Sequence, residues 1–389
     1  MMHNLLFIGM EYWDGVWRRS QNLVAGLARR FPEQKILFVE LPNNLSYAVR
    51  KRQWGEFWRG LRPYFPQPLP ELPNVFVFRP TKVFPNTLLL GRLANEAIYR
   101  TQVRRAARRL GMERPLLWIK PHYGAHLAGK MGECAVVYDV GDDWATISQP
   151  EAVRRRTLAE DAYLTCRADA VIVVSDYLLQ QKRPLREKVS LIPNGVEVER
   201  YLPISERTLT PHPLTCDWKS PVLGYTGMLH PDRLDIPLLI EVARAFPKGN
   251  VVLVGPSFLS LGDTKRLCSE PNILLTGPVE HLDLPRVMSA FDVCLVPNLV
   301  NAFSESQNPL KLYEYLASGL PTVSTPISGF RNYPELVSLA SDATTFVQAI
   351  RNALTEPKEK QERRQQEARK HTWDARVEAV LRVFAELPV

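Results

Sequence analysis

The residues best suited to chemistry are Lys311 and Glu314, which lie in the segment N-P-L-K-L-Y-E-Y-L-A-S-G. This segment is typical of a short helix with both ends marked. Asn308 can act as the N-cap, and Pro309 suits the first helical position. Gly319 suits the left-handed turn that ends a helix. The apolar run that follows, L-P-T-V-S-T-P, indicates a buried strand.

A helix that begins with free N–H groups, here those of Leu310 and Lys311, and carries a Lys in its first turn is a natural phosphate site. Glu314, one turn further, is well placed to accept hydrogen bonds from sugar hydroxyls. A phosphate site followed by a diol site is the layout of a nucleoside diphosphate. The alternative is an ordinary surface Lys–Glu pair at i, i+3 on a capped helix.

Two carboxylates, Asp142 and Asp143, follow the expected strand at residues 135–140 and precede Trp144. A carboxylate in such a loop can take the proton of a hydroxyl group, and a Trp ring can stack on a sugar. The acids could instead cap the next helix, or mimic a D-x-D metal site. Because a metal site of that kind belongs beside the phosphates, and the phosphate signals lie in the second half, we expect no metal here.

A loop near the N-terminus contains Trp13, Asp14, Trp17 and Arg18, residue types that stack on sugars and bind anions. A Trp pair is, however, just as typical of a protein core. His122 follows another expected strand and is a further candidate on the same side.

His122 and His126 have the i, i+4 spacing of a zinc pair on a helix. Pro121 and Gly124 argue against a helix at this point. We therefore expect no zinc site.

An open parallel sheet would bring these loops together. Residues 4–9, 20–30 and 35–40 read as strand, helix and strand, which is a βαβ unit. Further strands are expected at residues 74–79, 116–120, 135–140, 170–175 and 189–192, with helices at 86–111 and 151–167. Ligands of open α/β sheets bind beyond the carboxyl ends of the strands, where these loops lie. No G-x-G-x-x-G follows the first strand, which argues against a dinucleotide-binding dehydrogenase.

The second half repeats the strand–helix rhythm. Strands are expected at residues 222–227, 251–255, 273–276 and 293–297, and helices at 236–246 and 284–290. The proline-rich residues 196–221 are interpreted as the linker between two domains. The last segment, residues 357–387, is expected to be helical.

The chain has 389 residues, a formal net charge of +8 and five widely spaced cysteines, which suits a reducing compartment. No leader peptide and no membrane-spanning run is expected.

One basic cluster alternates with aromatic residues: Arg50, Lys51, Arg52, Arg59 and Arg62 with Trp54, Phe57, Trp58, Tyr64 and Phe65. A second basic run, from Arg100 to Arg109, reads as a helical face. This mixture favours an anionic membrane surface. No nucleic-acid-binding motif accompanies it, and a solvated basic face is the alternative.

Several segments together resemble the GT-B glycosyltransferases, especially family 4 and the teichuronic-acid type of surface-polysaccharide enzymes. In the second half they are G-Y-T-G-M-L-H, V-L-V-G-P-S, L-T-G-P-V, F-D-V-C-L-V-P and the segment around Lys311. In the first half they are W-D-G-V-W-R-R-S-Q-N-L, Y-D-V-G-D-D-W and I-P-N-G-V. The resemblance covers most of the chain, in the order the family has.

The resemblance implies an α/β fold of the GT-B class, with two Rossmann-like domains facing each other across a cleft. We expect residues 1–203 to bind the acceptor and residues 204–367 the nucleotide-sugar. Residues 368–389 should form a C-terminal helix that packs back toward the first domain.

The resemblance also assigns residues. Glu314 matches the second Glu of the family's E-x7-E, which binds ribose, while Ser306 stands where the pattern has its first Glu. Lys311 could neutralise charge on the diphosphate in place of that Glu, as in a smaller group of membrane-associated bacterial transferases. The remaining donor-side residues are Asn308, Leu310, Gly227, Arg233 and Val279, the last through its backbone toward the base.

The predicted function is transfer of a sugar from a nucleotide-sugar, with UDP as the nucleotide, to a lipid-linked or growing cell-surface glycan. Asp142, Asp143 and Lys311 are the predicted catalytic residues, and no cofactor or metal is expected. Trp13, Asp14, Trp17, Arg18, His122 and Trp144 are the predicted acceptor-side residues. The predicted location is cytoplasmic, at the inner face of the membrane. The alternatives are a nucleotide-sugar epimerase of the same fold and a non-catalytic scaffold.

Overall fold

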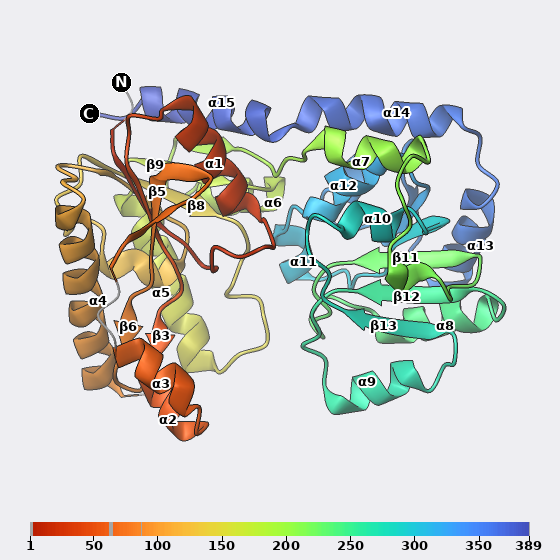
Figure 1. Cartoon of the computed structure of the whole chain (residues 1–389), viewed down its shortest axis with the longest axis horizontal. Coiled ribbons are helices and arrows are strands. Elements are labelled where there is room, and N and C mark those ends of the chain that lie inside the picture. Colours follow the sequence, from red (N-terminus) through yellow and green to blue (C-terminus); the bar gives the residue numbers. More distant parts are fainter. Residues whose placement is uncertain (1–2, 62–64, 87, 389) are drawn as a thin grey trace.

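The computed structural model describes residues 3–61, 65–86 and 88–388. It contains two parallel sheets, each covered by helices on both faces, which lie side by side in Figure 1. Arg62 and Tyr64 of the predicted basic cluster lie outside the described residues. The two-domain α/β prediction is confirmed.

The first sheet has the strand order β10-β9-β8-β7-β1-β2-β5-β4 and is parallel except for β4. In β1, Leu6 and Ile8 pack toward α4 and α5, while Leu5 and Phe7 pack toward α1 and α15. Burial on both faces explains why the strands read as continuous apolar runs. The strands are β1 Leu5–Ile8, β2 Ile36–Val39, β4 Gln67–Leu69, β5 Leu72–Phe78, β7 Leu116–Ile119, β8 Ala135–Val140, β9 Ala170–Val173 and β10 Val189–Leu191.

The helices around this sheet are α1 Arg19–Arg30, α2 Leu45–Arg50, α3 Trp54–Leu61, α4 Leu89–Arg109, α5 Glu151–Arg167 and α6 Asp176–Lys182, with the 3-10 turn η1 His122–His126. A separate small pair, β3 Asn43–Asn44 and β6 Thr81–Lys82, contacts α2, α3 and α4. In Figure 1 the α2–α3 hairpin projects from one end of the first domain. Neither α2 nor α3 was predicted, because both are short.

The second sheet has the order β13-β12-β11-β14-β15-β16, all parallel. Its strands are β11 Val222–Thr226, β12 Asn250–Val254, β13 Ile273–Gly277, β14 Val293–Val296, β15 Thr322–Ser324 and β16 Ser338–Leu339. The helices are α8 Ile236–Ala245, α9 Leu261–Cys268, α10 Leu284–Met288, α11 Ala302–Ser306, α12 Leu310–Ser318 and α13 Ala343–Ala353, with 3-10 turns η2 Pro213–Thr215 and η3 Phe330–Asn332.

The C-terminal segment crosses from the second domain to the first, along the top of Figure 1. It is not one helix but α14 Glu359–Ala368, the turn η4 Arg369–His371 and α15 Trp373–Ala385. α14 packs on α12, and α15 packs on α1. The chain therefore returns to the first domain, as the resemblance implies, and the break lies where it crosses. The exact domain boundaries at residues 203 and 367 stay a prediction.

The interpretation of residues 196–221 as an irregular linker was wrong in part. They begin with α7 Val198–Ser205, which includes Pro203. Val198, Tyr201 and Ile204 are buried in the core of the second domain, together with α12. Tertiary burial overrides the helix-breaking signal of a single Pro, which costs the helix one hydrogen bond.

Candidate active site

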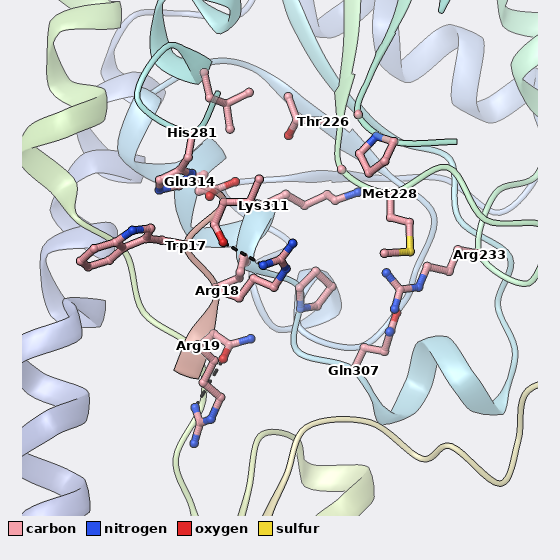
Figure 2. A pocket seen from close by; sticks show the side chains of 18 of the residues that line it. Trp17, Arg18, Arg19, Thr226, Met228, Arg233, His281, Gln307, Lys311 and Glu314 are labelled. Carbon is pink, nitrogen blue, oxygen red and sulfur yellow. Dashed lines mark hydrogen bonds between the residues drawn. The ribbon is translucent and has the colours of Figure 1, made fainter. Parts of the chain in front are cut away.

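A cleft of about 410 Å³ lies between the domains, beyond the carboxyl ends of β7, β8, β11 and β12 (Figure 2). This is where ligands of such sheets bind. Val279 and Leu310 contribute to its wall. Its charged side chains are five cations and two carboxylates: Arg18, Arg19, Lys120, Arg233, Lys311, Asp142 and Glu314. The excess of positive charge suits an anionic ligand.

Two glycines shape the second-domain wall. Gly227 and Gly255 follow β11 and β12 with φ of +128° and +143°, which side-chain-bearing residues rarely adopt. A Cβ atom on Gly255 would lie 2.1 Å from the Gly227 carbonyl oxygen, and one on Gly227 would lie 3.0 Å from Lys311 Nζ. The two strand ends therefore approach each other and Lys311 through bare backbone.

Lys311 lies in the first turn of α12, within the cleft. Its Nζ is 3.5 Å from the centroid of the Tyr225 ring. Burial, with the Arg233 charge, holds the pKa of Lys311 well below its usual range, and Glu314 opposes this only in part. Within the described residues, the Arg233 Nε has no hydrogen-bond partner. Both cations lie in the cleft, as labelled in Figure 2.

Glu314 lies one turn beyond Lys311 on the same wall of the cleft. Burial raises the pKa of Glu314, against the lowering influence of the Tyr201 hydroxyl, Lys311 and Arg200. The predicted arrangement of a cation at the start of α12 and a carboxylate one turn deeper is therefore present in the cleft.

The prediction that Asn308 is the N-cap of this helix was wrong by one residue. Pro309 holds that position, with φ −65° and ψ 129°, and the helix begins at Leu310. The Asn308 side chain has other partners: its Oδ1 accepts from the Asn194 N–H at 2.7 Å, and its Nδ2 donates to the Tyr313 hydroxyl at 3.1 Å. Asn308 thus joins the two domains beside the cleft. The left-handed Gly319 ends the helix as predicted, with φ +73°.

Asp142 reaches the cleft from the first domain and meets a residue that the sequence analysis did not select. Gln307 Nε2 donates to Asp142 Oδ1 at 2.7 Å across the domain boundary. Burial raises the pKa of Asp142, while Arg233, Gln307 and Lys120 act to lower it. A carboxylate whose pKa is raised in a cleft is a suitable proton acceptor.

Asp143, Trp144 and Ser306 lie outside this cleft, in the contact between the domains. The Asp143 N–H donates to Ser306 Oγ at 2.9 Å, and Ser175 Oγ donates to the Ser306 carbonyl at 2.7 Å. The Trp144 ring lies 5.8 Å from that of Phe303. Ser306 is fully buried, so where the family pattern has an acid, this chain has a domain contact. The Asp143 carboxylate accepts from the Ala145 N–H within the loop, and the next helix, α5, has no side-chain cap, so the capping alternative was wrong.

The N-terminal loop is divided between core and cleft. Trp17 and Arg18 line the cleft. Trp13 instead packs edge-on against Phe38, 5.0 Å between ring centroids, as the core alternative predicts. Asp14 stays on the exposed side of the loop, where its Oδ1 accepts from Arg18 Nη1 at 3.1 Å. His122 lies in a different cavity of the first domain.

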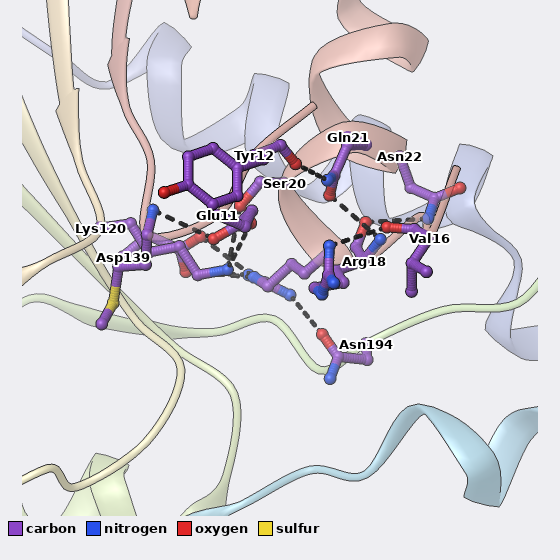
Figure 3. Close-up of polar contacts among 12 residues, drawn as sticks. Glu11, Tyr12, Val16, Arg18, Ser20, Gln21, Asn22, Lys120, Asp139 and Asn194 are labelled. Carbon is purple, nitrogen blue, oxygen red and sulfur yellow. Dashed lines mark hydrogen bonds and ion pairs between the residues drawn. The ribbon is translucent and has the colours of Figure 1, made fainter. Parts of the chain in front are cut away.

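A charged network below the cleft was not predicted (Figure 3). Arg19 Nε forms a buried ion pair with Asp139 Oδ2 at 3.0 Å, and Lys120 Nζ contacts Glu11 Oε1 at 3.1 Å and Ser20 Oγ at 2.9 Å. Burial alone would raise the pKa of Glu11, but Lys120 and Ser20 outweigh it and hold this pKa below its usual range. The sequence feature that could have indicated this network is a charged residue at the end of a buried strand, as at Lys120 and Asp139.

The facing Rossmann-like domains, with a cationic cleft at their strand ends, define the GT-B fold. The sucrose-phosphate synthase of Thermosynechococcus elongatus superposes with a TM-score of 0.72 at 17% identity, covering 99% of this chain and 98% of that one. At this identity the likeness shows the fold alone.

Sequence comparison identifies the second domain more closely. Residues 220–356 match the family "Glycosyl transferases group 1", so the chain contains a glycosyltransferase group 1 domain. A putative teichuronic acid biosynthesis glycosyltransferase of Bacillus subtilis is 31% identical over 49% of this chain and 50% of that protein. The UDP-Gal:alpha-D-GlcNAc-diphosphoundecaprenol alpha-1,3-galactosyltransferase of Escherichia coli is 27% identical over 36% of this chain and 38% of that protein. The matched parts span half or less of these relatives.

Proposed function

We propose that this protein is a glycosyltransferase that moves a sugar from a UDP-sugar to a glycan acceptor carried on a lipid. The observation that carries the proposal is the arrangement of Lys311, Arg233 and Glu314 in one cleft, beside backbone that Gly227 leaves open. The teichuronic acid and galactosyltransferase relatives support the same class of reaction. Both relatives are named as glycosyltransferases, so they favour neither the epimerase nor the scaffold alternative.

The donor diphosphate would bind between Lys311 and Arg233, at the N–H groups that begin α12. With the diphosphate bound, protonated Lys311 and Arg233 are already in place to stabilise the charge that grows on the leaving group. The carboxylate of Glu314 would accept hydrogen bonds from the ribose hydroxyls. Val279 lines the same wall and would meet the base through its backbone.

The acceptor would approach from the first domain, past Trp17 and Arg18. Its hydroxyl oxygen forms a bond to the anomeric carbon as the bond from that carbon to the diphosphate oxygen breaks. The hydroxyl proton passes to Asp142, and the bonding electron pair leaves with the diphosphate. Attack from the face opposite the diphosphate would invert the configuration at the anomeric carbon, and attack from the same face would retain it.

The acceptor proposal rests on chemistry and on one relative, whose name gives a diphosphoundecaprenol-linked acceptor. Within the described residues, no helix is both long and apolar enough to cross a membrane. A peripheral contact is supported by exposed apolar side chains on α3, where Trp54 and Trp58 are 53% and 62% exposed. Arg50, Lys51 and Arg52 are exposed beside them. We propose that this end of the first domain docks on an anionic membrane at its cytoplasmic face.

The test is to incubate the protein with UDP-glucose, UDP-galactose or UDP-N-acetylglucosamine, with and without a polyprenyl-diphosphate-linked sugar, and to follow UDP release. A transferase releases UDP faster when the acceptor is present, and addition of EDTA leaves the rate unchanged. Conversion of the donor sugar without UDP release would identify an epimerase instead. Donor binding with neither reaction would support a scaffold.

A further inference from the structure

A second cavity, of about 140 Å³, lies within the first domain, and we call it the distal pocket. Three elements form most of its wall: α4, α5 and the turn η1 after β7. They contribute Arg92 and Tyr99 from α4, Glu160 from α5, and His122, Tyr123 and His126 from η1.

Polar atoms without partners concentrate in this pocket. Among the described residues, eleven buried side-chain nitrogen or oxygen atoms make no hydrogen bond, and five of them belong to residues that line it. They are Arg92 Nε, His122 Nδ1, Tyr123 Oη, His126 Nε2 and Glu160 Oε2. Buried polar groups are nearly always hydrogen-bonded, so a concentration of unpaired ones in a cavity indicates a polar ligand.

The hydrogen-bonding capacity of these atoms indicates what kind of ligand. His126 Nδ1 lies 2.9 Å from the Tyr123 carbonyl, so Nδ1 carries the proton and Nε2 is left as an acceptor. Burial lowers the pKa of His126 and raises that of Glu160, so neither gains charge readily. Glu160 Oε2 is a further acceptor, while Arg92 Nε is a donor and the Tyr123 hydroxyl can do both.

A mixed set of donors and acceptors suits hydroxyl groups, which also donate and accept. A phosphate only accepts, so it would leave His126 Nε2 unpaired and would face Glu160. The cations Arg92 and Arg156 face carboxylates that partly neutralise them: Arg92 Nε lies 3.6 Å from Glu96 Oε1, and Arg156 Nε lies 3.7 Å from Glu160 Oε1. At these distances they are ion pairs but not hydrogen bonds, so Arg92 Nε can still donate one. Lys82 is a third cation of the wall. Tyr99 and Tyr123 also line the pocket and contribute aromatic rings to its wall.

The distal pocket is linked to the cleft through residues that line neighbouring cavities. Asp142 lines both the cleft and a small neighbouring cavity beside Trp144. His122 lines both that cavity and the distal pocket. Side chains at the carboxyl ends of β7 and β8 thus connect the proposed base to the distal pocket.

We infer that the distal pocket binds a sugar unit of the acceptor glycan, away from the unit that receives the transferred sugar. This inference rests on the proposed function and names a second acceptor subsite for it. Hydroxyl groups of the bound sugar would pair with Tyr123, His126, Glu160 and Arg92. Selection of longer acceptors over single sugars would follow.

Saturation-transfer NMR tests the inference on the whole chain, with UDP added to fill the cleft. The probes are the methyl glycosides of glucose, galactose, N-acetylglucosamine and glucuronic acid, and inorganic phosphate as the anionic competitor. We expect at least one glycoside to bind, and excess phosphate to leave its signal unchanged. Tyr123→Phe and Glu160→Gln should each weaken that binding about tenfold, the effect of one ordinary hydrogen bond. Glu151→Gln, an exposed position on the same helix α5, is the matched control.

Absence of binding by every glycoside, displacement by phosphate, or equal binding by Glu160→Gln and the control would each overturn the inference. UDP affinity, measured by calorimetry on the same samples, separates this result from the proposed function. Intact UDP binding without glycoside binding would contradict the distal subsite alone. A parent protein that does not bind UDP would contradict the proposed function itself.

Discussion

At the residue scale, Lys311 combines burial with a neighbouring cation, Arg233, and both lower its pKa. A bound diphosphate would reverse that effect, because an anion beside an amine favours the charged form. We therefore predict that UDP binding takes up protons at pH values between the lowered pKa of Lys311 in the free protein and its higher pKa in the complex. Calorimetric titrations in buffers of different ionisation enthalpy measure this uptake directly.

The uptake should disappear in Lys311→Met, while Lys265→Met, an exposed position on α9, should keep it. If Lys311→Met takes up as many protons as the parent, Lys311 does not face the diphosphate.

Asp142 gives a second prediction, in the pH dependence of transfer. Since burial raises its pKa, the carboxylate is protonated, and inactive as a base, to a higher pH than an exposed Asp. The rate should therefore rise with pH through a midpoint above that of an ordinary Asp. Because the Gln307 hydrogen bond lowers this pKa, Gln307→Leu should move the midpoint further up. A pH profile of kcat/KM measures both midpoints, and an unchanged midpoint in Gln307→Leu would separate Asp142 from the proton transfer.

Individual site residues were predictable only where reactive side chains lie at a recognisable spacing within one short segment. Lys311 and Glu314 are three residues apart on one helix, so their shared face follows from helical geometry. Gln307 and Asp142 are 165 positions apart, and Arg19 and Asp139 are 120 apart, so no local pattern pairs them. Trp13 and Trp17 both pack against the first-domain core, and only the folded structure shows that Trp17 also lines the cleft.

At the scale of elements, α11 contacts α6 of the first domain, while α12 forms part of the cleft wall. Ser306 ends α11, is fully buried and bonds to the Asp143 N–H. We predict that Ser306→Glu, which would restore the acid of the family pattern, destabilises the fold by about 3–5 kcal/mol, the effect of an uncompensated buried charge. Chemical denaturation measures this loss, with the exposed Ser341→Glu as control. A Ser306→Glu variant as stable as the control and more active would contradict the structural role of Ser306.

Long elements with clear periodicity followed from the sequence, and short ones did not. The strands of both sheets, apart from the edge strands β4 and β16, were predicted to within a few residues, as were the helices α1, α4, α5, α8 and α12. Residues 45–61 fold into α2 and α3 without a strong local signal, and α7 forms in spite of Pro203. The start of α12 shifts because the Asn308 side-chain oxygen accepts from the Asn194 N–H of the other domain rather than from an N–H group of its own helix.

At the scale of the molecule, the alternating strands and helices predicted two parallel sheets. The position of the break in the C-terminal helix was not predictable. The backbone carbonyl of His371 accepts from the Val196 N–H at 2.9 Å. The two chain segments that cross between the domains are therefore hydrogen-bonded to each other. A Cβ atom on Gly195 would lie 3.0 Å from the Trp373 nitrogen, a contact between segments far apart in sequence.

The proposed membrane contact is also a property of the whole molecule. Each basic residue near an anionic surface contributes about 1 kcal/mol, and inserted aromatic rings add apolar burial. We predict that the protein sediments with anionic liposomes at low salt and that salt weakens this binding. Trp54→Ser with Trp58→Ser should release the protein from the liposomes. The control replaces Phe258 and Leu261, exposed apolar residues of the second domain, by Ser. Equal release by both pairs, or no sedimentation of the parent protein, would remove the membrane from the proposal.

The central claim is that the cleft binds a nucleoside diphosphate with Glu314 on the ribose, and titration calorimetry with UDP tests it most directly. Removing the carboxylate's hydrogen bonds should cost about 1.5–3 kcal/mol, so Glu314→Gln should raise the Kd for UDP by about ten- to hundred-fold. Glu362→Gln, exposed on α14, should bind UDP as the parent does. UDP binding of equal strength by the parent, Glu314→Gln and Glu362→Gln would contradict the account.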